Sequence, residues 1–268
     1  MSQKLLAYII AIVLAALGLS PIHPPERKVN AMKLAWSDEG IGDANTSPNP
    51  ALWERRITDQ WQPAGELQAY TANVANAYYD GTGRLIIKAI KEPMAGKAYS
   101  SSRLRSPALW MYGLFEARIK VPNGTGIWPA WWLLGQDNPY GWPYCGEIDI
   151  MEAPASAATV NQAHQGTHSP GPNGENIAVG VPFSVGDWAQ DYHTYSINWQ
   201  PGSIEFFIDH KSKGKVTRAM VETAGGLWVF DHRPQSPILN LAVGGWAGTP
   251  DPAWSSQTMA IDWVRIYQ

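Results

Sequence analysis

Short segments that alternate apolar and polar residues recur along most of this chain of 268 residues. In LFEARIKV, the apolar residues Phe115, Ala117 and Ile119 alternate with charged ones, which is the period of a β-strand with one buried face. Turn-favouring clusters of Gly, Pro, Asn and Asp separate similar segments: GRLIIKAI, YHTYSINW, SIEFFID, ILNLAVGG and MAIDWVRIY. SKGKVTRAMVE is at most a short irregular piece. The pattern predicts an all-β fold, and a domain of about 230 residues favours a two-sheet jelly-roll sandwich over a barrel.

The N-terminal residues have a different character. Lys4 precedes an apolar run over residues 5–19, and prolines follow it. The run is shorter than the ~20 residues of a membrane span, and its layout is typical of a secretory signal peptide. We predict a signal peptide or N-terminal anchor at 1–20, a linker at 21–33 and one domain at 34–268. The protein is then secreted and extracellular, or tethered to a membrane if the leader is not cleaved.

Composition excludes some classes of partner. Lys and Arg total 20 and Asp and Glu total 23, a formal net charge of −3, so nothing indicates a nucleic acid partner. Cys145 is the only cysteine, which excludes an internal disulfide. The 14 tryptophans suit either stacking against sugar faces or a Trp-rich core.

The segment GEIDIMEAP has three carboxylates in six residues, on what looks like a buried strand. Alternation places Glu147 and Asp149 on one face and Ile148 and Ile150 on the other. Because burying an unpaired charge is costly, the acidic face must line a wet cleft. Glu152 joins that face only if a β-bulge adds one residue near 150–151.

Two carboxylates arranged in this way have a known chemistry. Retaining glycosidases place two carboxyl groups ~5–5.5 Å apart, one as nucleophile and one as acid/base. The alternative is a calcium site or a solvated acidic strand. Calcium ligands usually come from a flexible loop, whereas these acids lie on a strand backed by Ile and Met.

Ten segments in order resemble glycoside hydrolase family 16, in its laminarinase-like endo-1,3-beta-glucanase branch. They include GELQAYT, YSSSRLRS, YGLFEARIKVPNGTGIWPAWWLLG, WPYCGEIDIMEA and YHTYSINWQPGSIEFFID, and they cover residues 34–268. The resemblance implies a concanavalin A-like jelly-roll sandwich with a concave substrate cleft. It also implies Glu147 as nucleophile, Asp149 as its helper and Glu152 as acid/base, with no cofactor for catalysis.

The resemblance also implies the residues that bind substrate. Trp128 and Trp132 match sugar platforms and are four residues apart on one strand face, whereas Trp131 faces the core. The other matching positions are His168, Trp110, Arg103, Glu66 and Asn240, with Trp142 and Gln68 as further candidates. For each polar residue alone, a structural role is an equal alternative. His164 and His168 have the spacing of a helical metal pair, but HQGTHSPGPNG is too rich in Gly and Pro to form a helix.

The family often has a structural calcium ion on its convex face. The matching positions are Glu39, the backbone of Gly83, and Asp262, although single acids are often just solvated. The chain departs from the family at Gly40, at Gly65, in GGWAG, and in KGKVTRAMVETAGG, which we interpret as a variable loop.

We therefore expect a monomeric, retaining, endo-acting glycoside hydrolase that cleaves β-1,3-glucan and needs no protein partner. One alternative is a transglycosylase, or a hydrolase of another polysaccharide such as mixed-linkage glucan or a galactan. Another is a carbohydrate-binding sandwich without catalysis.

Overall fold

The alternating segments pair into two sheets. The computed structural model describes residues 32–57, 65–136 and 141–268. In these residues the larger sheet has ten strands. Eight of them are hydrogen-bonded side by side in one order, β1 pairs with β18, and β4 pairs with β5. The path and its flanking strands are β16 (Lys211–Thr217), β15 (Ser203–Ile208), β14 (His193–Gln200), β8 (Gly113–Lys120), β18 (Ser256–Tyr267), β5 (Leu85–Ile90), β6 (Tyr99–Ser101), β3 (Gln68–Tyr70), β1 (Leu34–Asp38) and β4 (Ala77–Tyr79).

The smaller sheet holds the acidic strand near its centre. Its described part has eight strands, of which β13 (Ser184–Val185) pairs with β11 beside the main path. The path is β12 (Asn176–Gly180), β11 (Gln162–Pro170), β10 (Glu147–Glu152), β9 (Ile127–Gly135), β17 (Gln235–Val243), β7 (Arg103–Arg105) and β2 (Glu54–Arg55).

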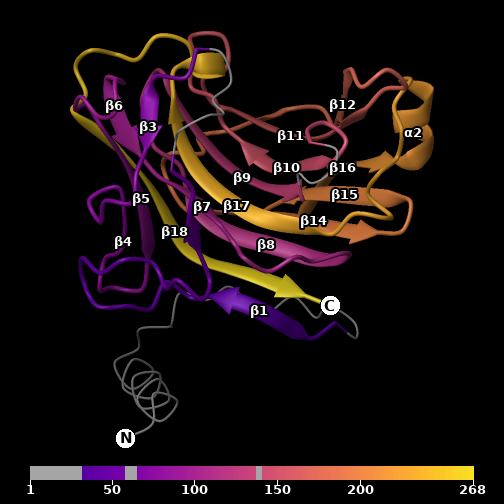
Figure 1. Cartoon of the computed structure of the whole chain (residues 1–268), viewed down its shortest axis with the longest axis horizontal. Helices are drawn as coiled ribbons and strands as arrows, with labels where there is room; N and C mark the ends of the chain where they lie inside the picture. Colours follow the sequence, from indigo (N-terminus) through magenta and orange to yellow (C-terminus); the bar gives the residue numbers. More distant parts are fainter. Residues whose placement is uncertain (1–31, 58–64, 137–140) are drawn as a thin grey trace, which may run out of the picture. The chain divides into compact units, whose positions relative to one another are not determined.

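The two sheets enclose the core, as the alternation predicts. Figure 1 shows β9, β10 and β17 of the smaller sheet lying over β8 and β14 of the larger one. Phe115, Ala117 and Ile119 of β8 are fully buried in one core cluster, and so are Ile148 and Ile150 of β10. The fold is the predicted all-β, two-sheet jelly-roll sandwich.

The predicted β-bulge lies in β10. The pairing of β10 with β9 shifts register between Asp149 and Met151, and the pairing with β11 shifts between Asp149 and Glu152. Ile150 and Met151 are consecutive, and both are fully buried in the core. Two neighbouring residues can face the core only where the alternation is broken, and this break returns Glu152 to the face of Glu147.

The segment interpreted as a variable loop is ordered secondary structure, so that prediction was wrong. Its residues form β16 and then the short helix α2 (Arg218–Thr223). The Thr217 side chain caps the helix by accepting from the Met220 backbone N–H over 3.3 Å, and Val221 is fully buried. A helix this short has too few turns to show a period in the sequence.

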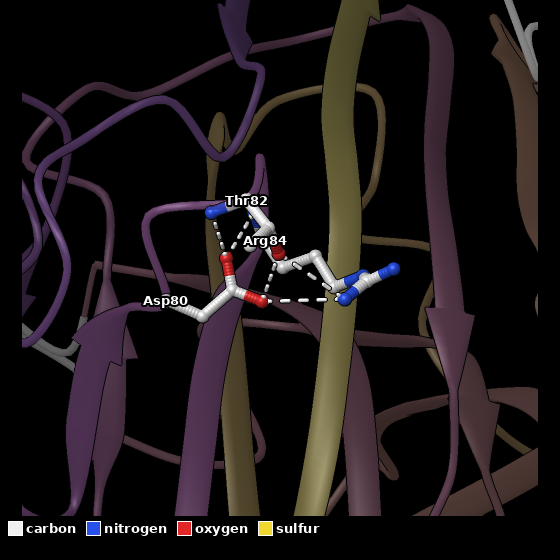
Figure 2. Close-up of polar contacts among 3 residues, drawn as sticks. All are labelled: Asp80, Thr82 and Arg84. Atoms are coloured by element: carbon white, nitrogen blue, oxygen red, sulfur yellow. Dashed lines mark hydrogen bonds and ion pairs between the residues drawn. The ribbon is translucent and has the colours of Figure 1, made fainter.

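A second short connection, between β4 and β5, is organised by one aspartate. Asp80 accepts hydrogen bonds from the Thr82 backbone N–H and hydroxyl, both at 2.7 Å, and from the Arg84 backbone N–H at 3.1 Å (Figure 2). Such a side chain closes a tight turn by satisfying backbone donors.

The chain divides into two units, Met1–Met32 and Lys33–Gln268, and the strands above belong to the second. The predicted leader at 1–20 and most of the linker at 21–33 lie outside the described residues. No helix in the part of the chain that the structure describes is long and apolar enough to cross a membrane.

Candidate active site

The outer face of the smaller sheet is hollowed by a cavity of about 740 Å³. The cavity crosses the sheet from β7 and β17, over β9, β10 and β11, to the edge strand β12. Glu147, Asp149 and Glu152 all line it, so the bulged strand presents all three acids to one space. A cavity that crosses several strands suits an extended ligand.

Glu152 lies at one end of this acidic row, in a site that favours its neutral form. Burial, and then the nearby charge of Glu147, raise the pKa of Glu152 to about 8. The Trp128 indole N–H donates to Glu152 Oε1 over 3.0 Å, which favours the carboxylate and lowers the pKa in part. At neutral pH Glu152 therefore carries a proton that it can donate.

Glu147 lies at the other end of β10 and has a different partner. The Trp142 indole N–H donates to Glu147 Oε2 over 2.8 Å. Each glutamate thus receives one indole hydrogen bond, from Trp142 on one side of the row and Trp128 on the other.

Asp149 lies between the two glutamates and is 3% exposed. Burial, and then the charges of Glu147 and Glu152, raise its pKa well above the usual range for an aspartate. Asp149 also shares a side-chain hydrogen bond with Glu147. A carboxyl group that holds its proton can donate it to a neighbouring carboxylate, which makes Asp149 a hydrogen-bond donor for Glu147.

His168 adds an imidazole to the same side of the cavity. It is the cross-strand partner of Glu147 on β11, and its Nε2 lies 3.4 Å from Asp149 Oδ2. Its Nδ1 lies 3.1 Å from Asn176 Oδ1. Because an amide oxygen can only accept, Nδ1 is the donor in this contact, and Nε2 is the ring nitrogen that faces Asp149.

The tryptophans of β9 divide between the two faces as predicted. Trp128 and Trp132 line the cavity, and Trp131 is fully buried in the core. Trp132 is only 8% exposed, its N–H donates to Asn240 Oδ1 over 2.7 Å, and the Arg103 guanidinium lies 4.7 Å from its ring centroid. It forms part of the cavity floor, under Arg103.

A buried polar network forms the end of the cavity near β7 and β17. Glu66, Arg103 and Asn240 line the cavity there, as predicted. Asn240 also donates to the Tyr70 hydroxyl over 3.1 Å, and burial raises the pKa of Glu66. Gln68 is fully buried, donates to Glu66 and accepts from the Val243 backbone N–H, so it positions Glu66 from below the cavity surface.

Comparison with known proteins agrees with this geometry. The model of the glycosyl hydrolases family 16 matches residues 66–265. The chain belongs to glycosyl hydrolase family 16. Among curated proteins, it is 36% identical to a beta-glucanase of Rhodothermus marinus, over 88% of this chain and 85% of that protein. It is 30% identical to a glucan endo-1,3-beta-glucosidase of Cryptopygus antarcticus, over 88% and 92% of the two chains.

A solved structure gives the same result. The catalytic domain of an endo-1,3-beta-glucanase (laminarinase) from Thermotoga petrophila matches with a TM-score of 0.75 and 34% identity, over 90% of this chain and 99% of that one. The protein is therefore a glycoside hydrolase, as the sequence predicted.

One predicted cleft residue of this family 16 chain lies elsewhere. Trp110 does not line the cavity but packs, partly buried, against the hydrophobic core. Its backbone N–H and C=O pair with Gln235 at 2.9 and 2.8 Å, at the start of β17. This bridge fixes the residue beyond the end of the cavity floor. Trp142, which was a further candidate, does line the cavity and is 39% exposed.

Two further cavity residues were not predicted from the sequence. Trp246 is on the 3-10 turn η1 (Gly245–Ala247), and its ring lies 5.7 Å from that of Trp128 and 4.6 Å from that of His164. His164 is the cross-strand partner of Glu152. The departure in GGWAG could have drawn attention to Trp246, and the alternation of β11 to His164. Neither signal gives the position of a turn over a sheet, because that depends on tertiary contacts.

The residues predicted to bind calcium do not fit a shared site as they stand. The Glu39 carboxylate is held by Arg265, with Nε at 3.0 Å and Nη2 at 2.8 Å. The Asp262 carboxylate pairs with Arg118. Since a calcium ion needs several oxygen ligands free to converge, two carboxylates that are held by different arginines do not provide its site.

Proposed function

We propose that this protein is a retaining, endo-acting hydrolase of β-1,3-glucan. The observation that carries the proposal is the unequal environment of two glutamates in one cavity. Glu152 keeps a proton up to a pH of about 8, because burial and the charge of Glu147 raise its pKa, while Glu147 accepts from the Trp142 indole and shares a hydrogen bond with Asp149. Double displacement needs one acid and one nucleophile in such an arrangement.

In the first step, Glu147 attacks the anomeric carbon of the sugar. The bond from that carbon to the glycosidic oxygen breaks, and Glu152 transfers its proton to the departing oxygen. The product is a glycosyl ester of Glu147. Asp149 donates its hydrogen bond to Glu147 before the attack and so keeps the nucleophile oriented without adding a second negative charge.

In the second step, water hydrolyses the ester. Glu152 is now a carboxylate. It removes a proton from the water while the water oxygen bonds to the anomeric carbon. Glu147 leaves as a carboxylate, and both groups return to their starting states. Two inversions at one carbon leave the configuration of the sugar unchanged.

The substrate class is inferred from the relatives and from the shape of the cavity. The named relatives are a beta-glucanase, a glucan endo-1,3-beta-glucosidase and an endo-1,3-beta-glucanase. A cavity that crosses the sheet can hold several sugar units on both sides of the cut, which supports internal cleavage. Trp128, Trp142 and Trp246 provide apolar rings for sugar faces along it.

A digest of laminarin, lichenan and agarose, with product sizes followed over time, tests the proposal. We expect laminarin to be cut fastest and to give intermediate oligosaccharides early. Glu147→Gln and Glu152→Gln should each lower kcat by about 100-fold or more. Glu205→Gln, the same change on β15 outside the cavity, should leave the rate unchanged. Wild-type rates in both cavity variants would overturn the roles, and release of single sugars only would overturn the endo action.

A further inference from the structure

Three side chains in the cavity bring possible metal-ligand atoms close together. One carboxylate oxygen each from Glu147 and Asp149 and a ring nitrogen of His168 lie within 4.8 Å of one another. Among the described residues, this is the one group of three His, Cys, Asp or Glu side chains close enough to hold a metal ion. The other His–carboxylate contacts, such as His193 with Asp209, are pairs.

The three ligand atoms are held by rigid elements. Glu147 and Asp149 are two residues apart on the cavity face of β10, and His168 is the direct cross-strand partner of Glu147 on β11. Both strands lie inside the smaller sheet, each with a neighbour on either side. A zinc ion holds N and O ligands at about 2.0–2.2 Å, so bound ligand atoms lie at most about 4 Å apart. Small side-chain rotations are enough to bring the three ligand atoms from within 4.8 Å of one another to this shorter separation.

Groups outside the trio hold two of these ligands in the orientation that metal binding requires. Asn176 Oδ1 accepts a hydrogen bond from His168 Nδ1. This leaves Nε2, the ring nitrogen that faces Asp149, as the one that can bind a metal ion. Trp142 donates to Glu147 Oε2 and so fixes the orientation of that carboxylate. Protein metal sites orient their imidazole and carboxylate ligands through outer hydrogen bonds of this kind.

We propose that Glu147, Asp149 and His168 bind a divalent transition-metal cation, such as Zn²⁺ or Cu²⁺, which inhibits the enzyme reversibly. One imidazole and two carboxylates favour these ions, whereas Ca²⁺ and Mg²⁺ favour sites made of oxygen alone. The ion occupies the place of the proton that Asp149 and Glu147 share. The bound ion occupies the nucleophile and also keeps the sugar from reaching it. The inhibition rests on the proposed function, but the binding does not.

Calorimetric titration of the full chain with ZnCl₂, in a buffer free of chelators, tests the binding. We expect one ion per chain, no comparable binding of CaCl₂, and weakening of the zinc affinity by a laminarin oligosaccharide. His168→Gln should lower the zinc affinity by about 10- to 100-fold. Glu147→Gln, which keeps the shape of the side chain, should lower it too. Near-UV circular dichroism checks that each variant is folded.

His193→Gln is the matched control, because His193 contacts Asp209 at 2.7 Å and could bind zinc as an exposed pair. We expect it to leave stoichiometry and affinity unchanged. Equal zinc binding by wild type, His168→Gln and Glu147→Gln would overturn the proposal, and so would loss of binding in His193→Gln. Hydrolysis without zinc binding would refute this inference alone, whereas zinc binding without hydrolysis would refute the proposed function alone.

Discussion

Trp128 donates its indole N–H to Glu152 Oε1 over 3.0 Å. From the sequence, Trp128 was expected only to stack on sugar. The structure shows that it also acts on the carboxyl group that we propose as acid/base. Because the hydrogen bond favours the carboxylate, it sets part of the balance that leaves the pKa of Glu152 at about 8.

Removing this donor should change the pH dependence of hydrolysis. Activity requires protonated Glu152, so kcat/KM of the wild type should fall as the pH rises through about 8. Trp128→Phe removes the contact that lowers the pKa, and we expect the alkaline limb to move to higher pH. Trp132→Phe is the control, because that indole donates to Asn240. An unchanged limb in Trp128→Phe would contradict this role.

The same pKa predicts that stability falls as the pH rises from 4.5 to about 8. The folded pKa of Glu152 is raised from 4.5 to about 8, so between these values the native state binds more protons than the unfolded state. The free energy of unfolding should therefore fall as the pH rises across this window. Glu152→Gln removes this contribution, so its stability relative to the wild type should increase from pH 5 to pH 8. Urea unfolding at both pH values measures the difference.

The tryptophans of the core and of the cavity should respond differently to truncation. Trp131 is fully buried between the sheets, and Trp131→Ala should lower the free energy of unfolding by about 3–5 kcal/mol. Trp246 is 42% exposed, so Trp246→Ala should change stability by less than about 1 kcal/mol and mainly raise KM for laminarin. Equal effects on stability would show that the two sites are assigned wrongly.

The turn between β4 and β5 should depend on Asp80 (Figure 2). Asp80→Ala leaves the donors of Thr82 and Arg84 without their acceptor and should cost about 1–2 kcal/mol in urea unfolding. Asp187→Ala, at an exposed position, should cost less than about 0.5 kcal/mol. An Asp80 variant as stable as the control would show that the turn is held by other contacts.

Local rules explain how much of this molecule was predictable from the sequence. The bulge in β10 follows from the cost of burying Glu152, and the separation of Trp131 from Trp132 follows from strand alternation. Trp110 was expected in the cleft but lies outside it, and Trp246 was not predicted at all. The positions of both rings depend on a bridge and a turn that form only in the folded chain. The indole hydrogen bonds to Glu147 and Glu152 come from the segment before β10 and from β9, so no single motif contains both of them.

The configuration of the newly formed reducing end tests the central claim most directly. Proton NMR during the first minutes of laminarin hydrolysis, before mutarotation mixes the anomers, identifies the first product. Double displacement through Glu147 and Glu152 predicts that the β-anomer appears first and the α-anomer later. First appearance of the α-anomer would mean a single displacement by water and would contradict the roles given to both glutamates.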